Sequence, residues 1–250
     1  MSPGATHFGY KRVPINEKPK LVAGVFSSIA EKYDLMNDVM SMGTHRLIKR
    51  MAVRVSEVIS NDYVLDLAGG TGDLTIHFSR IVGINGRVIL ADINENMLKA
   101  GQRRLSRIGI SKNVTYMKTD AQYLPFDNNS FDCVTISFGI RNFTDVRAAL
   151  HSVKRVLKPN GRLVILDFAK PKNRLLQKAC HLYSFGFVPL AGRVFTGDGN
   201  SYRYLAESIR MHPDQETLKR MMEETGFSGC HYYDIMNGII ALHKGTKPRG

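Results

Sequence analysis

Short apolar runs that alternate with helical segments limit this chain to a small set of folds. The runs have four or five residues each and cover residues 64–67, 87–91, 114–117, 133–136 and 163–166. Helical periodicity separates most of them, as in residues 94–107 and 145–157. Strands that alternate with helices are typical of a parallel sheet with helices on both faces, so we expect a three-layer α/β fold.

The segments around these runs extend the same pattern. Residues 1–20 hold three prolines among polar residues and are interpreted as an extended arm, and residues 21–59 follow a helical spacing with a break at 33–38. The Lys-Pro-Asn-Gly sequence at residues 158–161 is expected to end a helix. Residues 214–225 predict a helix that stops at Gly226. Two β-like runs joined by Asn237-Gly238 then predict a C-terminal antiparallel hairpin.

Composition narrows the class of protein only partly. The 250 residues carry a formal charge of +13, which suits nucleic acid, an anionic membrane surface or an acidic ligand alike. No run resembles a transmembrane helix, and the N-terminus lacks the apolar region of a signal peptide. Cys133, Cys180 and Cys230 show neither metal-ligand spacing nor a disulfide framework. We therefore expect a cytoplasmic protein without a metal site.

A glycine-rich turn, Ala68-Gly69-Gly70-Thr71-Gly72-Asp73, follows the first apolar run directly. Glycines let the backbone turn tightly and approach a ligand, and the carboxyl edge of a parallel sheet is where such ligands bind. Thr71 adds a hydroxyl near the start of the next helix, where free amides attract negative groups. An ordinary strand-to-helix turn has similar glycines, so the turn alone leaves a structural and a cofactor-binding role equally open.

The acidic residues around this turn favour a particular ligand. Asp92 ends the second run, about 20 residues beyond the turn, where a carboxylate accepts both hydroxyls of a ribose. A nicotinamide cofactor would use the same pair, but the turn lacks the third glycine of the dinucleotide fingerprint. Asp66 and Asp73 would repel a pyrophosphate and suit a ligand with an ammonium and a sulfonium. The expected co-substrate is S-adenosylmethionine.

Polar positions also follow the next two runs. Asp120, with Ala121 beside it, comes after the third run, where a carboxylate can accept from an adenine amino group, and Ser137 ends the fourth. Either alone is an ordinary strand end. Together, polar positions at four consecutive strand ends predict an S-adenosylmethionine-dependent methyltransferase. The predicted donor contacts are Asp66, Gly70, Thr71, Gly72, Asp92, Asp120, Ala121 and Ser137.

Longer segments resemble the C-methyltransferases of ubiquinone and menaquinone biosynthesis nearly end to end. The most specific are Phe138-Gly139-Ile140-Arg141-Asn142 and Ser201-Tyr202-Arg203-Tyr204-Leu205, and His212-Pro213-Asp214-Gln215 also matches. The resemblance implies a class I, Rossmann-like methyltransferase fold with a seven-stranded sheet and the same donor contacts. Asp167 stands where a glutamate is expected and keeps the charge. We expect one structural domain, with residues 1–60 as arm and covering helices and 61–250 as the methyltransferase domain.

The resemblance also implies the acceptor, a ring carbon of a polyprenylated quinol (demethylmenaquinol, 2-methoxy-6-polyprenyl-1,4-benzoquinol, or both). A ring carbon is a poor nucleophile until a neighbouring hydroxyl is deprotonated. Arg141 stays protonated, so we expect it to hold the phenolate or orient a water, unless it forms a structural pair with a carboxylate. Asn142 would bond the second ring oxygen. Tyr33 and Asp34 would cover the pocket or supply a base, or simply end a helix.

The isoprenoid tail of such a substrate leads to expectations about partners. Residues 174–195 are apolar and aromatic, and they would line the tail's entrance or touch the bilayer, or form a core helix and a loop. Arg46, Lys49, Arg50 and Arg54 would meet anionic lipid or form a solvated face. We expect peripheral contact at the inner face of the membrane, and a homo-oligomer or a quinone-biosynthesis complex is compatible with the sequence.

Four other functions fit parts of the sequence. A nucleic-acid methyltransferase fits the charge, but the chain lacks an Asn/Asp-Pro-Pro-aromatic signature after the fourth run, and Cys133 lies inside a predicted strand. No nucleic-acid partner is therefore expected. A nicotinamide-dependent oxidoreductase fits the glycine pattern poorly. A methyltransferase for another small molecule, or a binding module without chemistry, would retain the same fold.

Overall fold

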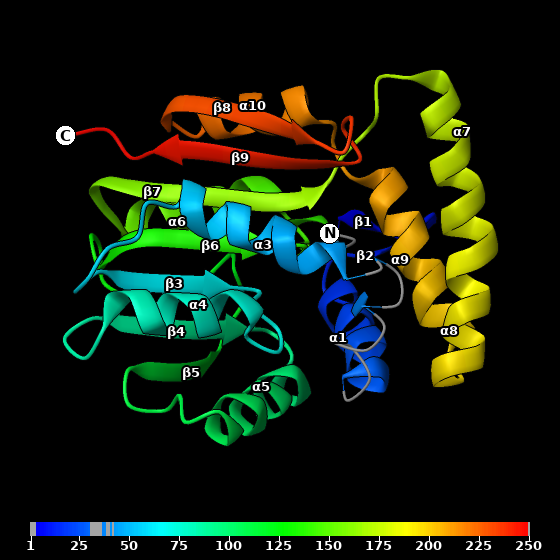
Figure 1. The fold of residues 1–250 in the computed structure, drawn as a ribbon. Helices are drawn as coiled ribbons and strands as arrows, with labels where there is room; N and C mark the ends of the chain where they lie inside the picture. Colours follow the sequence, from blue (N-terminus) through cyan, green and yellow to red (C-terminus); the bar gives the residue numbers. More distant parts are fainter. Residues whose placement is uncertain (1–3, 31–36, 39–40, 42, 250) are drawn as a thin grey trace.

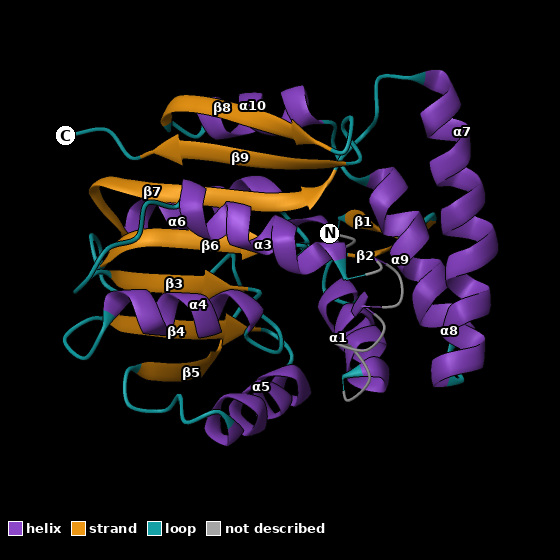
Figure 2. Ribbon diagram, viewed as in Figure 1, coloured by secondary structure: helices purple, strands orange, loops and turns teal. Residues whose placement is uncertain are grey.

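The computed structural model describes residues 4–30, 37–38, 41 and 43–249. A seven-stranded sheet with the order β5-β4-β3-β6-β7-β9-β8 forms its centre. Helices cover both faces of this sheet (Figure 2). The predicted α/β class I architecture is confirmed.

Five strands of the sheet are parallel, and each contains one of the apolar runs. They are β3 (Tyr63–Leu67), β4 (Arg87–Asp92), β5 (Val114–Lys118), β6 (Phe131–Ser137) and β7 (Leu157–Phe168). The chain leaves β3 toward β4 on one side and later returns to β6 on the other. This change of direction opens a crevice at the carboxyl ends of the central strands, where ligands bind in open α/β sheets.

The sheet ends in the predicted C-terminal hairpin. β9 (Ile240–Thr246) pairs antiparallel with both β7 and β8 (Ser228–Ile235). Residues 236–239 connect the two strands, and Met236, Asn237 and Gly238 all have positive φ angles. The turn is therefore wider than the two-residue Asn-Gly turn that the sequence indicated.

Two groups of helices sandwich the sheet. α3 (Thr44–Val55), α4 (Asp73–Val82) and α5 (Glu95–Arg107) cover one face, and α6 (Val146–Val156) and α10 (Gln215–Glu224) cover the other (Figure 1). Three of these helices begin where the sequence predicted, because a polar side chain accepts from the free amides of the first turn. The capping residues are Asn94, Asp145 and Asp214.

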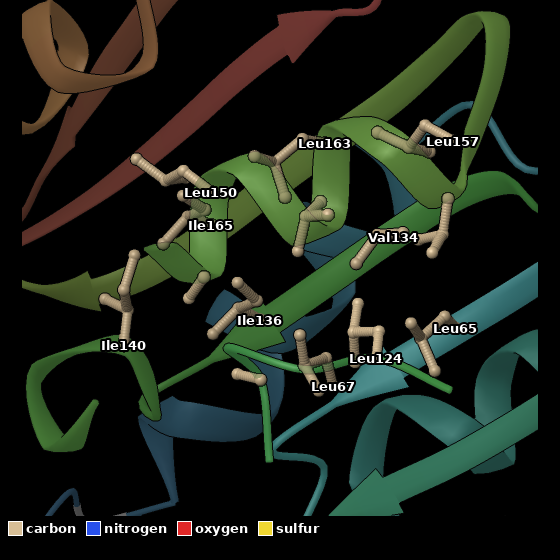
Figure 3. Packing of buried hydrophobic residues seen from close by; sticks show 14 of the residues in the cluster. Leu65, Leu67, Leu124, Val134, Ile136, Ile140, Leu150, Leu157, Leu163 and Ile165 are labelled. Carbon is tan, nitrogen blue, oxygen red and sulfur yellow. The ribbon is translucent and has the colours of Figure 1, made fainter. Parts of the chain in front are cut away.

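The largest core lies between the central strands and α6. Val134, Ile136, Leu163 and Ile165 alternate inward along β6 and β7 and meet side chains of α6 (Figure 3). At the carboxyl end of the strands this core includes Ile140, which is fully buried in the short 3-10 turn η1 (Ile140–Asn142). Burying such a side chain contributes roughly 1.5–3 kcal/mol. The core thus fixes the turn that carries Arg141 and Asn142.

A further group of elements lies at the carboxyl edge of the sheet. It comprises the hairpin β1 (Ala5–Phe8) and β2 (Lys11–Pro14), and helices α1 (Lys18–Ile29), α7 (Arg174–Leu182), α8 (Val188–Thr196) and α9 (Gly199–Met211). In Figure 1, α1 stands beside the arrowheads of the parallel strands, and α7 and α8 form the outer edge. The π-helical turn η2 (Tyr183–Phe187) joins α7 to α8. Gly192 permits close packing of α8 on α9, since a Cβ there would lie 2.2 Å from Tyr202 Cδ2.

Two local predictions were wrong. The segment of residues 1–20 is not extended throughout: it forms the β1–β2 hairpin, and α1 starts at Lys18 with Pro19 in its first turn, where the missing N–H costs nothing. The Lys-Pro-Asn-Gly sequence directly follows the end of a helix, as predicted. α6 stops at Val156, and the sequence lies near the start of β7, where Asn160 N donates to Lys247 O. Residues 174–195 contain no loop, because the helical structure continues through the π turn.

Candidate active site

The glycine-rich turn adopts backbone conformations that explain its composition. Ala68, Gly70 and Gly72 have φ angles of 54°, 56° and 85°, and Gly72 precedes the first residue of α4. Gly69 leaves no room for a side chain, since a Cβ there would lie 2.4 Å from Leu90 Cδ1. The turn therefore packs against β4, where Gly69 N donates to Ala91 O at 3.1 Å.

A cavity lies directly above this turn, at the carboxyl ends of β3, β4, β5 and β6. Its empty volume, open mouth included, is about 760 Å³. Six of the predicted site residues line it: Gly70, Asp92, Asp120, Ala121, Ser137 and Asn142. The sheet topology has brought these positions together from four separate strand ends.

Asp92 is the most constrained of the lining carboxylates. Its two oxygens accept from Gly70 N at 3.0 Å and from Asn94 N at 2.8 Å, so the turn and the start of α5 both orient it. Burial raises the pKa of Asp92 to about 6, and the backbone hydrogen bonds only partly oppose this. The carboxylate is ionised at neutral pH and can accept hydroxyl groups in the cavity.

The other half of the cavity offers groups suited to an adenine ring and an amino-acid moiety. Asp120 accepts from Gln122 N at 2.9 Å, which fixes its carboxylate beside the buried Ala121. Ser137 Oγ is buried without a hydrogen-bond partner among the described residues. A buried hydroxyl without a partner is uncommon and indicates a group that bonds a ligand. These residues fit S-adenosylmethionine.

Four other predicted residues lie outside the cavity lining. Asp66 is buried and accepts from Thr75 N and Oγ1 and from Thr135 Oγ1, so its oxygens are used within the core. Burial raises the pKa of Asp66 to about 6. Thr71 and Gly72 shape the turn behind Gly70. Their roles as donor contacts, like those of the lining residues, stay predictions.

Asp73 does not point its charge at the cavity. It pairs with Lys49 of α3 and, at 2.6 Å, with Arg104 of α5, and these cations hold the pKa of its carboxyl well below its usual range. Lys49 is consequently buried and not available to lipid, and Arg46 pairs with Asp38. The expectation that four cations of this helix form one basic face is therefore wrong for Lys49.

Arg141, the fourth predicted residue outside the lining, forms a buried ion pair. Its Nη1 lies 2.6 Å from Asp167 Oδ1, and both side chains are only 2% exposed. Arg141 Nε and Asp167 Oδ2 are buried and find no partner among the described residues. The sequence left open whether Arg141 forms a structural pair with a carboxylate, and the structure shows that it does. The pair leaves the Nε donor and the Oδ2 acceptor unused.

Asn142, the neighbour of Arg141 on η1, does line the cavity. Tyr204 of α9 donates its hydroxyl to Asn142 Oδ1 at 3.0 Å, and the Tyr204 ring stacks on Phe8 of β1 at 4.2 Å. Burial raises the pKa of Tyr204, so the phenol keeps its proton. The amide oxygen of Asn142 is thereby occupied, and its NH₂ group is free to donate into the cavity.

The roof of the cavity comes from α1, which supplies Pro19, Val22, Ala23 and Phe26. The sequence predicted an arm and covering helices within residues 1–60, but it did not indicate which side chains of this helix line the cavity. Tyr33 and Asp34, which were predicted to cover the pocket, lie outside the described residues. Among the described residues, no cluster of histidine, cysteine or acidic side chains could hold a metal ion, and no helix is long and apolar enough to cross a bilayer.

A family model supplies the decisive comparison. The model described as the ubiE/COQ5 methyltransferase family matches residues 14–247. The chain belongs to this family. It is a methyltransferase that uses S-adenosylmethionine, in agreement with the groups that line the cavity.

Curated relatives of this family match over almost their full length. The chain is 59% identical to the ubiquinone/menaquinone biosynthesis C-methyltransferase UbiE of Teredinibacter turnerae, and the match covers 97% of each chain. It is 58% identical to the protein of the same description from Pseudomonas putida, over 97% of this chain and 95% of the relative.

Solved structures agree on the fold. An Aquifex aeolicus SAM-dependent methyltransferase superposes with a TM-score of 0.62 at 16% identity, covering 86% of this chain and 97% of that one. Phosphoethanolamine N-methyltransferase 2 of Haemonchus contortus, in complex with S-adenosyl-L-methionine, gives a TM-score of 0.61 at 15% identity, covering 80% and 52%.

Proposed function

We propose that this chain transfers a methyl group to a ring carbon of a polyprenylated quinol, either demethylmenaquinol or 2-methoxy-6-polyprenyl-1,4-benzoquinol. The observation that carries this proposal is the near full-length identity of 59% and 58% to ubiquinone/menaquinone biosynthesis C-methyltransferases. The cavity is consistent with it, because an apolar roof and a donor-bearing amide suit a flat aromatic ring with oxygens on its edge.

S-adenosylmethionine, when bound, supplies a methyl group that its sulfonium already activates. The residues of this chain therefore act mainly by orienting the two substrates and by excluding water. Asp92 accepts the ribose hydroxyls, Asp120 and Ala121 hold the adenine, and Ser137 and Gly70 bond the amino-acid part. α1 closes the cavity against solvent with the apolar side chains of Val22 and Phe26.

On the acceptor side, the ring must carry partial negative charge to attack a carbon centre. Asn142 donates its NH₂ group to a ring oxygen, since Tyr204 occupies the amide oxygen. Arg141 acts through Nε, the donor that its pair with Asp167 leaves unused, and bonds the developing phenolate or a water that takes its proton. The guanidinium itself stays protonated throughout.

A methyl-transfer assay with reduced substrates tests the proposal. Labelled S-adenosylmethionine is incubated with each of the two quinols and, separately, with the corresponding oxidised quinones. Label on the ring of at least one quinol, and none on the quinones, is the expected result. No transfer to either quinol, in a protein that binds S-adenosylmethionine, would remove quinols as the acceptor class. Transfer to a nucleic acid or another small molecule would then become the leading candidate.

The proposal includes peripheral contact with a membrane, since the tailed substrate resides there. The outer face of α7, η2 and α8 carries an apolar stripe that α9 does not cover, made of Leu175, Leu182, Phe187, Leu190 and Val194, which are 47–76% exposed. Residues 170–197 contain five Lys or Arg residues and no acidic residue. An apolar stripe with basic flanks is the pattern of helices that lie in an anionic lipid surface.

Vesicle co-sedimentation tests this contact. The variant with Leu182→Asp and Leu190→Asp should lose binding to vesicles that contain phosphatidylglycerol, whereas Leu47→Asp should keep it. Leu47 is 64% exposed on α3, at a distance from the stripe, and so provides a matched control. Equal binding by both variants would locate any membrane contact elsewhere.

A further inference from the structure

The helix α1 is held to two opposite walls of the cavity by polar side chains. On the donor side, Asn94 Nδ2 donates to Ala23 O at 2.8 Å and to Ser27 Oγ at 3.0 Å. On the acceptor side, Lys18 Nζ donates to Phe143 O at 2.7 Å. Phe143 directly follows Asn142 and lines the cavity with it. The helix therefore connects the donor-binding wall to the wall that meets the acceptor ring.

Lys18 has surroundings that are unusual for a lysine. It is 6% exposed, and among the residues that the structure describes no carboxylate pairs with it. Lys49, which is buried to the same degree, pairs with Asp73. Lysines are almost never fully buried unless paired, because an ammonium without an anion loses solvation free energy. A side chain retained under these conditions is a candidate for a role in the reaction.

No neighbouring charge accounts for the lowered pKa of Lys18. Arg141 on η1 is neutralised by Asp167, and Arg203 and Glu207 on α9 pair with each other at 3.2 Å. Burial is the sole cause that lowers the pKa of Lys18, to about 8. The other titratable or charged side chains of the described elements around α1 and of the cavity are His7, Glu17, Lys20, Asp92, Glu95, Lys99, Arg103, Arg104, Arg107, Asp120, Tyr204 and Arg210.

We propose that the Lys18 ammonium is a positioning group for methyl transfer, which holds the Phe143 carbonyl and thereby keeps α1 and the Asn142 wall in their reactive arrangement. The charged form makes the stronger hydrogen bond to the carbonyl, and loss of the proton weakens the connection. The inference rests on the proposed function, in which Asn142 meets a quinol oxygen.

Three variants separate this role from folding. Lys18→Met keeps the apolar stem and removes the charge. Lys18→Arg keeps a positive donor that does not titrate in the accessible pH range. Lys20→Met, two residues away on the exposed side of α1, is the matched control. All are assayed anaerobically on the quinol that the wild type methylates, with the melting temperature measured at each pH.

The expected results follow from the sign of the pKa shift. The wild type has the charged form below about pH 8 and loses it above that value, so kcat should fall on the alkaline side. Lys18→Met should lower kcat roughly 10–100-fold at neutral pH, the cost of misplacing reacting groups by a fraction of an ångström to an ångström, without a lower melting temperature. Lys18→Arg should restore most of kcat and shift the alkaline loss to higher pH. Lys20→Met should match the wild type.

Hydrogen exchange gives a readout that needs no substrate. The amides of Asn142 and Phe143, which donate to Gly139 O and Ile140 O, should exchange faster in Lys18→Met than in Lys20→Met. Unchanged exchange, unchanged kcat in Lys18→Met, or an alkaline limb that stays near pH 8 in Lys18→Arg would overturn the proposal. A fall in kcat matched by a fall in melting temperature in both Lys18 variants would assign Lys18 to folding alone and overturn it too. If the wild type methylates neither quinol, the proposed function fails, and the exchange data still decide the role of Lys18.

Discussion

Replacing Asp92 by asparagine tests the donor site most directly. The substitution keeps the size of the side chain and removes its charge. It also introduces an NH₂ group where both carboxylate oxygens now accept, from Gly70 N and from Asn94 N. One of these backbone amides would then face another donor, so the variant loses an acceptor for the ligand and gains a local conflict.

The size of the effect follows from the hydrogen bonds that are lost. A hydrogen bond to a charged group contributes about 1.5–3 kcal/mol, compared with 0.5–1.5 kcal/mol for a neutral pair. Losing the charge toward two ribose hydroxyls should therefore weaken binding by about 2–3 kcal/mol, which is a roughly 30- to 160-fold higher Kd for S-adenosylmethionine. The conflict with the backbone amides makes the lower end of this range a minimum.

The pH dependence provides an independent signature. Donor binding requires the carboxylate, so affinity should fall about tenfold per pH unit below the pKa of about 6. Stability of the donor-free protein has the opposite trend. Since the folded pKa of Asp92 is raised above its ordinary value near 3.8, its contribution to the free energy of unfolding is full at acid pH and is lost as pH rises through about 6. Asp92→Asn should remove both dependences.

Calorimetric titration with S-adenosylmethionine, at about pH 7.5 and about pH 5, checks these expectations. Asp132→Asn is the control, because Asp132 lies at the opposite end of the sheet, bonded to Tyr63 N and Lys158. It should bind the donor like the wild type. A Kd for Asp92→Asn within about threefold of the wild type, or an unchanged loss of affinity at low pH, would refute the assignment of the ribose to Asp92.

The remaining predictions concern the acceptor side and the core. Arg141→Ala leaves Asp167 as a buried charge without its partner, so urea unfolding should show a free energy of unfolding lower by about 3–5 kcal/mol. Turnover should fall while donor affinity is retained. Unchanged turnover would exclude Arg141 from the reaction. Tyr204→Phe frees the Asn142 amide to rotate, and kcat should drop roughly tenfold with little change in donor Kd; equal kcat would show that the hydroxyl is dispensable. Cys133 is fully buried with a pKa raised to about 12, so a thiol reagent should label it far more slowly than Cys180 in the native protein; equal rates would contradict its burial.

Much of the fold was predictable because the relevant signals are local. The apolar runs predicted the five parallel strands, since a strand buried on both faces needs continuous apolar sequence. Asn94, Asp145 and Asp214 marked helix starts because a capping side chain bonds amides two or three residues away. Contacts that are distant in sequence were not predictable: proline and glycine at residues 158–161 marked the end of a helix, but not the strand β7, in which Asn160 N donates to Lys247 O.

In the candidate site, too, some features were predictable from the sequence and others were not. Asp92, Asp120 and Ser137 could be proposed from sequence because strand ends in a parallel sheet converge at one edge, whatever the details of packing. The partners of charged side chains could not. The charge of Asp73 was expected to favour a ligand with positive groups, yet Lys49 and Arg104 from two other helices neutralise it, and Asp167 does the same to Arg141. Both outcomes depend on contacts between residues 24 to 31 positions apart in the chain, which no local pattern encodes.

The sequence by itself determined the layered α/β architecture, the edge of the sheet where the cavity lies and the methyltransferase family, because periodicity, glycine placement and strand-end residues act over short distances. Only the tertiary structure decided which side chains of α1 line the cavity, that Tyr204 fixes the direction of the Asn142 amide, and that Lys18 reaches the Phe143 carbonyl. These contacts join residues 62 and 125 positions apart in the chain. Their geometry follows from how whole helices pack on the sheet, and packing depends on the shape of every surface involved.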